Sequence, residues 1–296
     1  MNSNSSNIDI GVIGGTGLYS IESLENVQEV KIETPYGRPS DLIRIGNISG
    51  TKVAFLARHG RHHSFLPTEI PYQANIWAMK SLGVKWIISV SAVGSLKKEI
   101  KPLDIVIPDQ FIDRTKNRPF SFFGSGAVAH ISMAQPFCPY LSSLLLDCAA
   151  SLIPKDRKLH SGGTYLCMEG PAFSTQAESK LYQAMGCSVI GMTNHTEARL
   201  SKEAEIAYAT LAMSTDYDCW HEEHDNVTVE MIVSNLHSNA DLASKIICKA
   251  ITKIGILRPN SASHNALKDA LISQEKHVPA QTKEKLNLIT QKYWKS

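Results

Sequence analysis

Short apolar stretches rich in valine and isoleucine recur along the chain, separated by more polar segments. They lie at 8–15, 52–58, 86–95, 104–112, 188–193 and 205–213. Within each stretch the apolar residues are nearly continuous instead of alternating with polar ones, which is typical of strands buried on both faces. The pattern therefore predicts a central sheet that other elements cover on both sides.

Segments with helical periodicity lie between several of these stretches. Residues 71–83 begin with Pro71 and end with Gly83, the residue types that often open and close helices. Comparable patterns occupy 139–153, 174–186 and 228–251. The alternation predicts an α/β fold, a single domain over 8–256 with a central mixed β-sheet flanked by helices. We expect residues 257–296, which begin with a polar segment, to form a C-terminal tail that is partly helical or disordered.

Composition narrows the class of partner. The chain has 296 residues, 43% of them hydrophobic, which is enough to bury a sizeable core. Charged residues make up 20%, the formal net charge is +2, and lysine and arginine are scattered. Because nucleic-acid-binding proteins usually concentrate basic residues, we expect no nucleic acid and no anionic membrane as partner. No apolar stretch approaches the roughly 18 residues of a membrane span.

The six cysteines bear on the compartment. No two of them form a C-x-x-C pair and several lie inside apolar stretches, which favours free buried thiols over a disulfide framework or a zinc site. The segment 1–9 is polar and lacks the basic and apolar regions of a signal peptide. We therefore expect a cytoplasmic protein.

Candidate binding chemistry gathers where the predicted strands end. In open α/β sheets, ligands bind at the carboxyl ends of the strands. Those ends carry glycine-flanked hydroxyls, an arginine beside histidines, and two acids, at 14–17, 58–63, 91–95, 168–174, 192–193 and 215–218. The sequence therefore predicts a ligand site along this edge of the sheet.

One part of this edge suits an anion. Gly14, Gly15 and Gly17 surround Thr16, which fits either an anion site or a tight turn, because the pattern is neither G-x-G-x-x-G nor a P-loop. Arg58 is either a bidentate ligand of a phosphate or a strand-end salt bridge. Further donors are Ser91, Ala92 and Thr193. Together these residues predict a pocket for free phosphate. The histidines at 58–63 have no carboxylate nearby, so we expect no metal.

The two acids are Asp216 and Asp218, two positions apart at the end of the apolar stretch 205–213. They belong to a solvated loop or helix cap, or they face one ligand together. Alternate residues of an extended segment point the same way, so the second alternative is geometrically available.

Several long motifs occur in an order that resembles a known family. They are "GVIGGTGLY", "LARHGRHH", "PYQANIWAMKSLG", "SAVGSLKKEIKPLDIVIPDQFIDRT", "HISMAQPFC", "MEGPAFSTQAES", "GMT" and "STDYDCW". Over about residues 8 to 256 the chain resembles the trimeric branch of the purine nucleoside phosphorylase superfamily, and most closely its methylthioadenosine phosphorylase family.

The resemblance implies a nucleoside phosphorylase-like fold and a homotrimer. It implies phosphorolysis of 5′-methylthioadenosine to adenine and 5-methylthioribose-1-phosphate, a purine and methionine salvage reaction. Inorganic phosphate would be the co-substrate, with no cofactor and no metal.

The resemblance also implies roles for residues that match the family motifs. Phosphate would be bound by Thr16, Arg58, His59, Ser91, Ala92 and Thr193. Met192 would lie under the ribose, and Phe173 and Ser174 would flank the purine. Asp216 would act as general acid toward N7, and Asp218 would accept from the exocyclic N6 amino group. Val229 and Ile232 would line the methylthio pocket, and His130 would reach the neighbouring subunit's site.

Other functions of the same fold stay open. The 6-oxopurine branch carries Asn in place of Asp216 and Glu in place of Ser174. A carboxylate facing a 6-oxo group would set acceptor against acceptor, which favours 6-aminopurines here. The alternatives are a 6-oxopurine nucleoside or methylthioinosine phosphorylase, a hydrolase, and a non-catalytic nucleoside-binding protein. Asn194, His195 and Thr196 depart from the animal enzymes, and we expect Asn194 or Thr196 to cap the next helix.

Overall fold

The computed structural model describes residues 8–15, 23–221 and 229–294. Thr16 and Gly17 lie outside these ranges. The side chain of Ile232 is also outside the described part of the chain.

The described residues form eleven strands of one mixed sheet. The strands are β1 (Ile10–Gly14), β2 (Glu25–Val30), β3 (Ile43–Ile48), β4 (Thr51–Ala57), β5 (Trp86–Ser95), β6 (Ile105–Ile107), β7 (Gln110–Arg114), β8 (Leu159–Ser161), β9 (Thr164–Met168), β10 (Val189–Gly191) and β11 (Ala207–Asp216). The main path is β2-β3-β4-β1-β5-β10-β9-β7, and β11 joins β5 to β6 and β8. Strand β5 is the branch point, because it pairs in parallel with β1 and β11 and antiparallel with β10.

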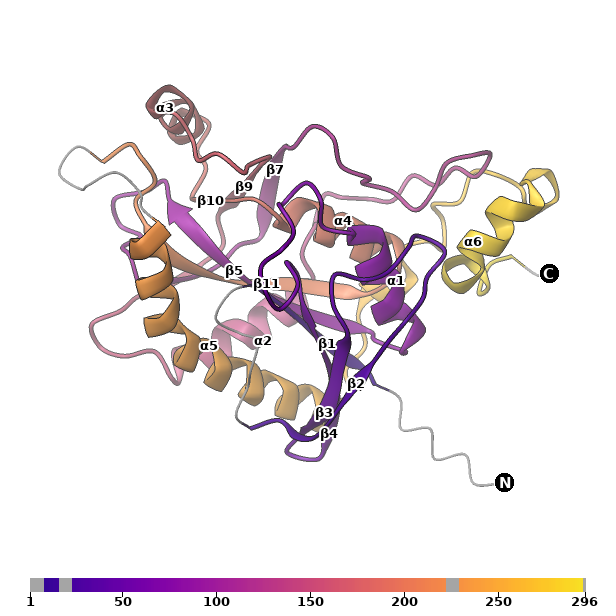
Figure 1. Ribbon diagram of the computed structural model, residues 1–296, viewed down its shortest axis with the longest axis horizontal. Coiled ribbons are helices and arrows are strands. Elements are labelled where there is room, and N and C mark those ends of the chain that lie inside the picture. Colours follow the sequence, from indigo (N-terminus) through magenta and orange to yellow (C-terminus); the bar gives the residue numbers. More distant parts are fainter. Residues whose placement is uncertain (1–7, 16–22, 222–228, 295–296) are drawn as a thin grey trace.

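Helices cover both faces of this sheet (Figure 1). Helices α2 (Pro139–Ala150) and α5 (Val229–Leu257) pack on one face, and α1 (Tyr72–Ser81) and α4 (Asn194–Glu203) on the other. Helix α6 (Ala280–Thr290) packs against α1. Helix α3 (Gln176–Ala184) lies toward the sheet edge near β9 and β10. All ten residues of β11 are buried, which explains its continuous apolar stretch. The predicted α/β class with a central mixed sheet is confirmed.

Some elements differ from the sequence prediction. The single strand expected at 104–112 is two strands, β6 and β7, separated at Pro108 and Asp109. Proline lacks the N–H that a continuous ladder would use. Strand β2 escaped prediction because four of its six residues are polar and five are exposed, at the edge of the sheet. Helix α4 was also missed, because polar residues occupy most of its length, although six of these polar residues are buried.

The C-terminal residues 258–294 fold back onto the domain. They contain two short 3₁₀ helices, Ala262–Asn265 and Glu275–His277, and helix α6. Leu286 and Ile289 are buried in the same cluster as the core side chains of α1 and α4. The tail also pairs with the segment that carries His130, whose backbone N–H donates a 2.8 Å hydrogen bond to the Ala270 carbonyl.

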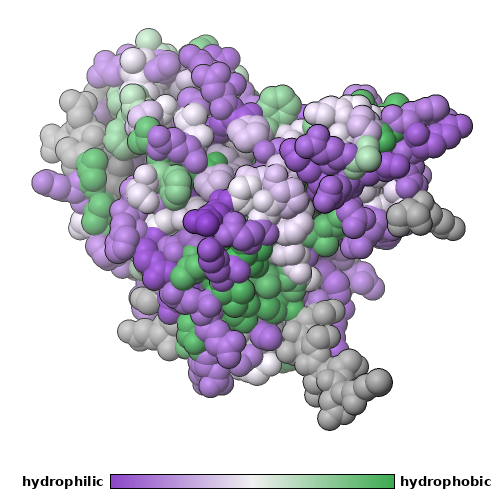
Figure 2. Space-filling model, turned by 45° about the vertical axis from the view of Figure 1, so that its right-hand side comes forward, coloured by the Kyte–Doolittle hydropathy of each residue, from purple (hydrophilic) through white to green (hydrophobic). Residues whose placement is uncertain are grey.

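The surface carries exposed apolar side chains alongside polar ones. Four of these apolar side chains are between 41% and 76% exposed, namely Phe120, Val128, Ile256 and Ile272. Figure 2 shows a hydrophobic area bounded by hydrophilic residues on one face of the molecule. Exposed apolar areas of this kind are suited to contacts with another chain. Among the described helices, none combines the length and apolarity needed to cross a bilayer.

Candidate active site

A cavity of about 400 Å³ opens at the carboxyl ends of β5, β10 and β11. The loop after β4, the loop after β9 and the start of α5 complete its walls. The pairing register brings Asp216 of β11 beside Gly94 of β5, so that the ends of these two strands form one wall. The cavity therefore lies where the sequence placed the ligand site.

Most predicted site residues share this cavity. Those that line it are Arg58, His59, Ser91, Ala92, Phe173, Met192, Thr193, Asp216, Asp218 and Val229. Ser174 is not among its lining residues. Burial raises the pKa of Asp218, and the hydroxyls of Ser179 and Ser174 offset part of that rise. His130 is exposed and lies outside the cavity of its own chain.

Arg58 is almost fully buried and forms an ion pair with Glu197 of α4. Its Nε and Nη2 atoms both donate to the Glu197 carboxylate, so this edge of the guanidinium is engaged within the protein. Nη1 donates to the Val90 carbonyl at 3.1 Å and lies beside Gly15. Burial alone would lower the pKa of Arg58, but the Glu197 charge outweighs it and raises that pKa. Arg58 is thus both a salt bridge and a cavity residue.

His59 is held in a defined tautomer. Its Nδ1 lies 2.9 Å from the Phe65 carbonyl oxygen, which can only accept, so Nδ1 carries the proton. Burial lowers the pKa of His59 to about 4, so the ring is neutral at physiological pH. The ring stacks on His63 at a centroid distance of 4.3 Å. Nε2 is consequently a hydrogen-bond acceptor.

Ser91 is supported by a residue that sequence reasoning missed. Its Oγ lies 3.0 Å from the hydroxyl of Tyr165, which is fully buried on β9. Tyr165 packs so closely against Gly191 that a β-carbon there would overlap its hydroxyl. The apolar context of Tyr165 in "TYLC" reads as core, so only the close approach to glycine reveals its role.

Asp216 is the last residue of β11 and is 5% exposed. Its Oδ2 accepts from the Thr215 hydroxyl at 2.7 Å, and its Oδ1 accepts from the backbone N–H of Asp218 at 2.8 Å. Burial raises the pKa of Asp216, and these two hydrogen bonds offset only part of that effect. A carboxyl group in this environment retains a proton to higher pH than an exposed aspartate does.

Asp218 follows in a left-handed turn with φ of 53°. Its side chain is buried and its Oδ2 has no hydrogen-bond partner among the described residues. Burial also raises the pKa of Asp218. A buried carboxylate oxygen without a partner is costly unless a ligand supplies a donor, so Asp218 is a strong candidate for a ligand contact.

The loop after β9 is anchored by a second buried arginine. Arg118 donates to the carbonyls of Glu169 and Met192 and also contacts the Glu169 side chain. The Glu169 carboxylate in turn accepts from Thr68 and from the Lys116 N–H. These contacts fix Met192 and the loop that presents Phe173.

The three departures from the animal enzymes lie behind the cavity. Asn194, His195 and Thr196 are buried in the first turn of α4, and none of them lines the cavity. The expectation that Asn194 or Thr196 caps this helix is wrong, since the N-cap position is Thr193 and has no side-chain cap bond. Asn194 instead donates to Tyr208 and Thr210 of β11.

Helices cover both faces of the sheet, and the cavity at its strand ends is lined by a buried arginine and two buried aspartates, an arrangement typical of α/β proteins that bind small ligands. The family model described as "Phosphorylase superfamily" matches residues 9–252, and the chain belongs to this superfamily.

Known relatives resolve the family further. The chain is 60% identical to S-methyl-5′-thioadenosine phosphorylase of Prochlorococcus marinus, over 97% of this chain and 92% of the relative. It is 59% identical to the protein of the same name from Thermosynechococcus vestitus, over 96% and 98%. These relatives place the chain in the S-methyl-5′-thioadenosine phosphorylase family.

Solved structures agree. A methylthioadenosine phosphorylase from an Antarctic soil metagenomic library is 50% identical, with a TM-score of 0.92 over 96% of this chain and 99% of that one. The methylthioadenosine phosphorylase of Schistosoma mansoni, solved with adenine, is 33% identical with a TM-score of 0.80, over 84% and 92%.

Proposed function

We propose that the protein catalyses phosphorolysis of 5′-methylthioadenosine to adenine and 5-methylthioribose-1-phosphate, which serves purine and methionine salvage. The observation that carries the proposal is the pair Asp216 and Asp218, both buried in one cavity wall, with Asp218 Oδ2 unpartnered among the described residues. The names of the relatives support the same reaction.

At the base end, Asp216 protonates N7 of the purine while the C1′–N9 bond breaks. The bond's electron pair moves onto the purine as the sugar gains oxocarbenium character, and the added proton neutralises that charge. Asp218 Oδ2 accepts from the N6 amino group, which a 6-oxopurine lacks. Asp216 regains its proton from solvent after adenine leaves.

Thr215 allows Asp216 to work in both protonation states. The Thr215 hydroxyl has two acceptors within reach, Asp216 Oδ2 at 2.7 Å and the Val93 carbonyl at 3.3 Å. When Asp216 is ionised, the hydroxyl donates to it. When Asp216 carries the catalytic proton, the hydroxyl rotates to Val93, so no buried donor is left unpaired.

At the phosphate end, inorganic phosphate is the co-substrate, and we propose no cofactor and no metal. A phosphate oxygen forms the new bond to C1′, while the remaining negative charge stabilises the oxocarbenium ion. The donors are Arg58, Ser91, Thr193 and the Ala92 N–H, with Thr16 as a further donor outside the described residues. The neutral His59 accepts from the phosphate hydroxyl, since its Nδ1 is already committed to Phe65.

The sugar lies between these ends, over Met192, with Phe173 against the purine. Val229, Val233 and Leu236 of α5 line the cavity and offer an apolar wall for the methylthio group. Ile232 is assigned to this wall by resemblance alone. A 5′-hydroxyl would gain nothing from these side chains, which favours methylthioadenosine over adenosine.

We propose a homotrimer in which His130 enters the neighbouring site. His130 is exposed, and the nearby Val128 and Ile272 are 41% and 62% exposed. Sedimentation analysis tests the assembly, and His130→Ala should raise KM for the nucleoside without dissociating the oligomer. We also propose a cytoplasmic location, supported by six free cysteines, four of them buried.

The test of function is a base-release assay with purified protein. Methylthioadenosine, adenosine, inosine and methylthioinosine are compared with and without phosphate. Phosphate-dependent adenine release, fastest with methylthioadenosine, is the expected result. Release without phosphate would identify a hydrolase, preference for an inosine would identify a 6-oxopurine enzyme, and binding without release would identify a nucleoside-binding protein.

A further inference from the structure

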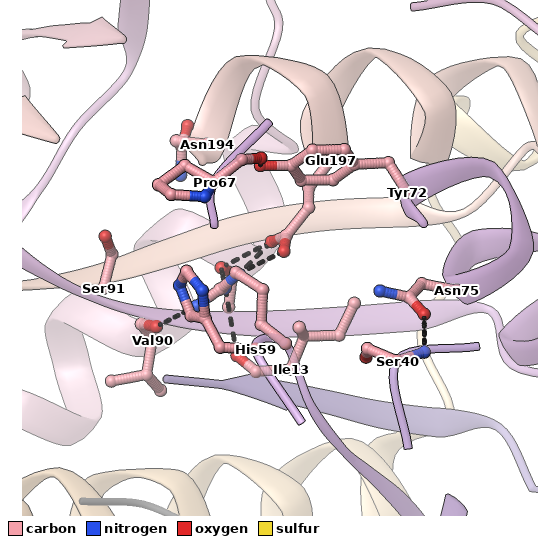
Figure 3. A network of polar contacts seen from close by, with 12 residues as sticks. Ile13, Ser40, His59, Pro67, Tyr72, Asn75, Val90, Ser91, Asn194 and Glu197 are labelled. Atoms are coloured by element: carbon pink, nitrogen blue, oxygen red, sulfur yellow. Dashed lines mark hydrogen bonds and ion pairs between the residues drawn. The ribbon is translucent and has the colours of Figure 1, made fainter. Parts of the chain in front are cut away.

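A buried polar cluster lies behind the phosphate end of the cavity, built from β4, β5, β11 and α4. Its centre is the Glu197 carboxylate, which reaches from α4 toward the strands (Figure 3). Glu197 accepts from Arg58 Nε, from Arg58 Nη2 at 2.9 Å, from Ser89 Oγ at 3.0 Å and from the Tyr208 hydroxyl at 2.9 Å. A carboxylate has about four acceptor positions, so Glu197 is saturated and has none left for a substrate.

The donors of Arg58 can be assigned in the same way. A guanidinium has about five N–H groups. Nε and one Nη2 hydrogen are directed to Glu197. The second Nη2 hydrogen is shared between Ser89 Oγ at 2.8 Å and the Ile13 carbonyl at 3.4 Å. One Nη1 hydrogen is directed to the Val90 carbonyl. One Nη1 hydrogen is left without a partner among the described residues, on the atom that lies beside Gly15 at the cavity wall.

An outer layer fixes the orientation of the inner one. Asn194 Nδ2 donates to the Tyr208 oxygen at 3.3 Å and also to Thr210 Oγ1. Because the Tyr208 oxygen accepts from Asn194, its own hydrogen is free to donate to Glu197. Burial raises the pKa of Tyr208 well above its usual value, which keeps this hydroxyl a donor. Asn194, one of the departures from the animal enzymes, therefore supports Glu197 through Tyr208.

We propose that Glu197 is a positioning residue for phosphate, and that the relay Asn194–Tyr208–Glu197 holds Arg58 so that one Nη1 hydrogen points into the phosphate end of the cavity. This inference rests on the proposed phosphorolysis. It assigns phosphate recognition to a residue that touches no substrate.

A purely structural role predicts a different pattern. A buried ion pair adds little net stability compared with apolar packing, so stability alone gives no reason for four converging donors. If the cluster only supported the fold, its disruption would affect both substrates alike. If the cluster orients Arg58, its disruption would weaken phosphate binding and leave nucleoside binding unchanged.

The first test uses Tyr208→Phe, which removes one donor to Glu197 and keeps the ring. We expect KM for phosphate to rise about 5- to 10-fold, which corresponds to roughly 1–1.4 kcal/mol, while KM for methylthioadenosine stays within about twofold. Titration calorimetry with inorganic phosphate alone should show a matching loss of affinity. Tyr36→Phe is the matched control, because the Tyr36 hydroxyl is buried, has no partner among the described residues, and lies outside the cavity.

The second test uses Glu197→Gln, which keeps the size of the side chain but presents an amide to the guanidinium. The amide NH₂ group would face the N–H donors of Arg58, so the bidentate interaction is lost. KM for phosphate should then rise about 100-fold or more. Should this variant fail to fold, Tyr208→Phe still decides. An equal rise in both KM values, or unchanged phosphate affinity in Tyr208→Phe, overturns the positioning role while the proposed function stands. A wild-type protein without phosphate-dependent activity overturns both.

Discussion

The backbone N–H of Asp218 donates a 2.8 Å hydrogen bond to Oδ1 of Asp216. This bond joins the end of β11 to the left-handed residue after it and sets the two carboxyl groups at a fixed relative orientation. The two carboxyl groups differ, since both oxygens of Asp216 accept a hydrogen bond whereas Asp218 Oδ2 has no partner among the described residues. The pair can therefore divide the work of donating and accepting a hydrogen bond.

Replacing Asp216 tests the general acid. Asp216→Asn keeps the size of the side chain but cannot protonate N7, so kcat for methylthioadenosine should fall about 10²- to 10⁴-fold. The amide can donate to a 6-oxo group, so the ratio of inosine-type to adenosine-type activity should rise. Adenine and hypoxanthine release measure both changes. An unchanged kcat would remove Asp216 from the chemistry.

The pH dependence follows from burial of the same residue. The raised pKa of Asp216 keeps it protonated to higher pH, so kcat/KM should fall as the pH rises through that value. Asp218 must be ionised to accept a hydrogen bond from the N6 amino group, so kcat/KM should also fall as the pH drops through the pKa of Asp218. The acidic and alkaline limbs of the profile belong to the two aspartates as a coupled pair. Asp216→Asn should abolish the alkaline limb, measured at saturating phosphate. Persistence of that limb would assign it to another group.

The raised pKa of Asp216 also determines how the free energy of unfolding changes with pH. A carboxyl with a raised folded-state pKa binds its proton more tightly in the folded state than in the unfolded state. Its contribution to the free energy of unfolding therefore decreases as pH rises from its ordinary value through the raised one. Asp216→Asn should flatten this part of the stability profile in urea titrations, relative to the wild type at each pH.

Two variants of Asp218 separate recognition from backbone conformation. Asn tolerates a positive φ, so Asp218→Asn should keep the melting temperature while KM for methylthioadenosine rises about 10-fold or more. Asp218→Ala adds backbone strain at φ of 53° and should also lower the melting temperature. Equal melting temperatures for the two variants would show that the left-handed turn stores no strain.

The tail offers a stability test away from the cavity. Leu286 of α6 is fully buried, so Leu286→Ala should lower the free energy of unfolding by about 2–5 kcal/mol. The neighbouring Lys285 is exposed, and Lys285→Ala should stay within about 0.5 kcal/mol of the wild type. Urea unfolding compares the two. Equal effects would mean that α6 does not add to the common core.

The sequence predicted the central strands well because their apolar stretches are continuous. For Asp216 and Asp218, the expected reason for their shared direction was alternation along an extended strand, and this reason is wrong. In the structure β11 ends at Asp216, and a turn brings Asp218 back to the same cavity. Long-range register and turn conformation depend on pairing with β5, which a local pattern does not encode.

The sequence also could not predict the buried residues that surround Arg58. Ser89 and Tyr208 lie within apolar stretches and look like ordinary strand residues, and Glu197 looks like a surface residue of an amphipathic helix. Their convergence depends on strands and a helix that are distant along the chain. A polar side chain in the middle of an otherwise apolar strand was the available signal, and Ser89 and Thr210 both carry it.

The C-terminal residues complete packing around α1, a helix that is synthesised long before them. Until residues 258–294 have been synthesised, the cluster that Leu286 and Ile289 join cannot be complete. Domains generally fold as units once their parts are available. Folding of the unit that carries Asp216 and Asp218 therefore waits for Leu286 and Ile289, which take no part in the cavity.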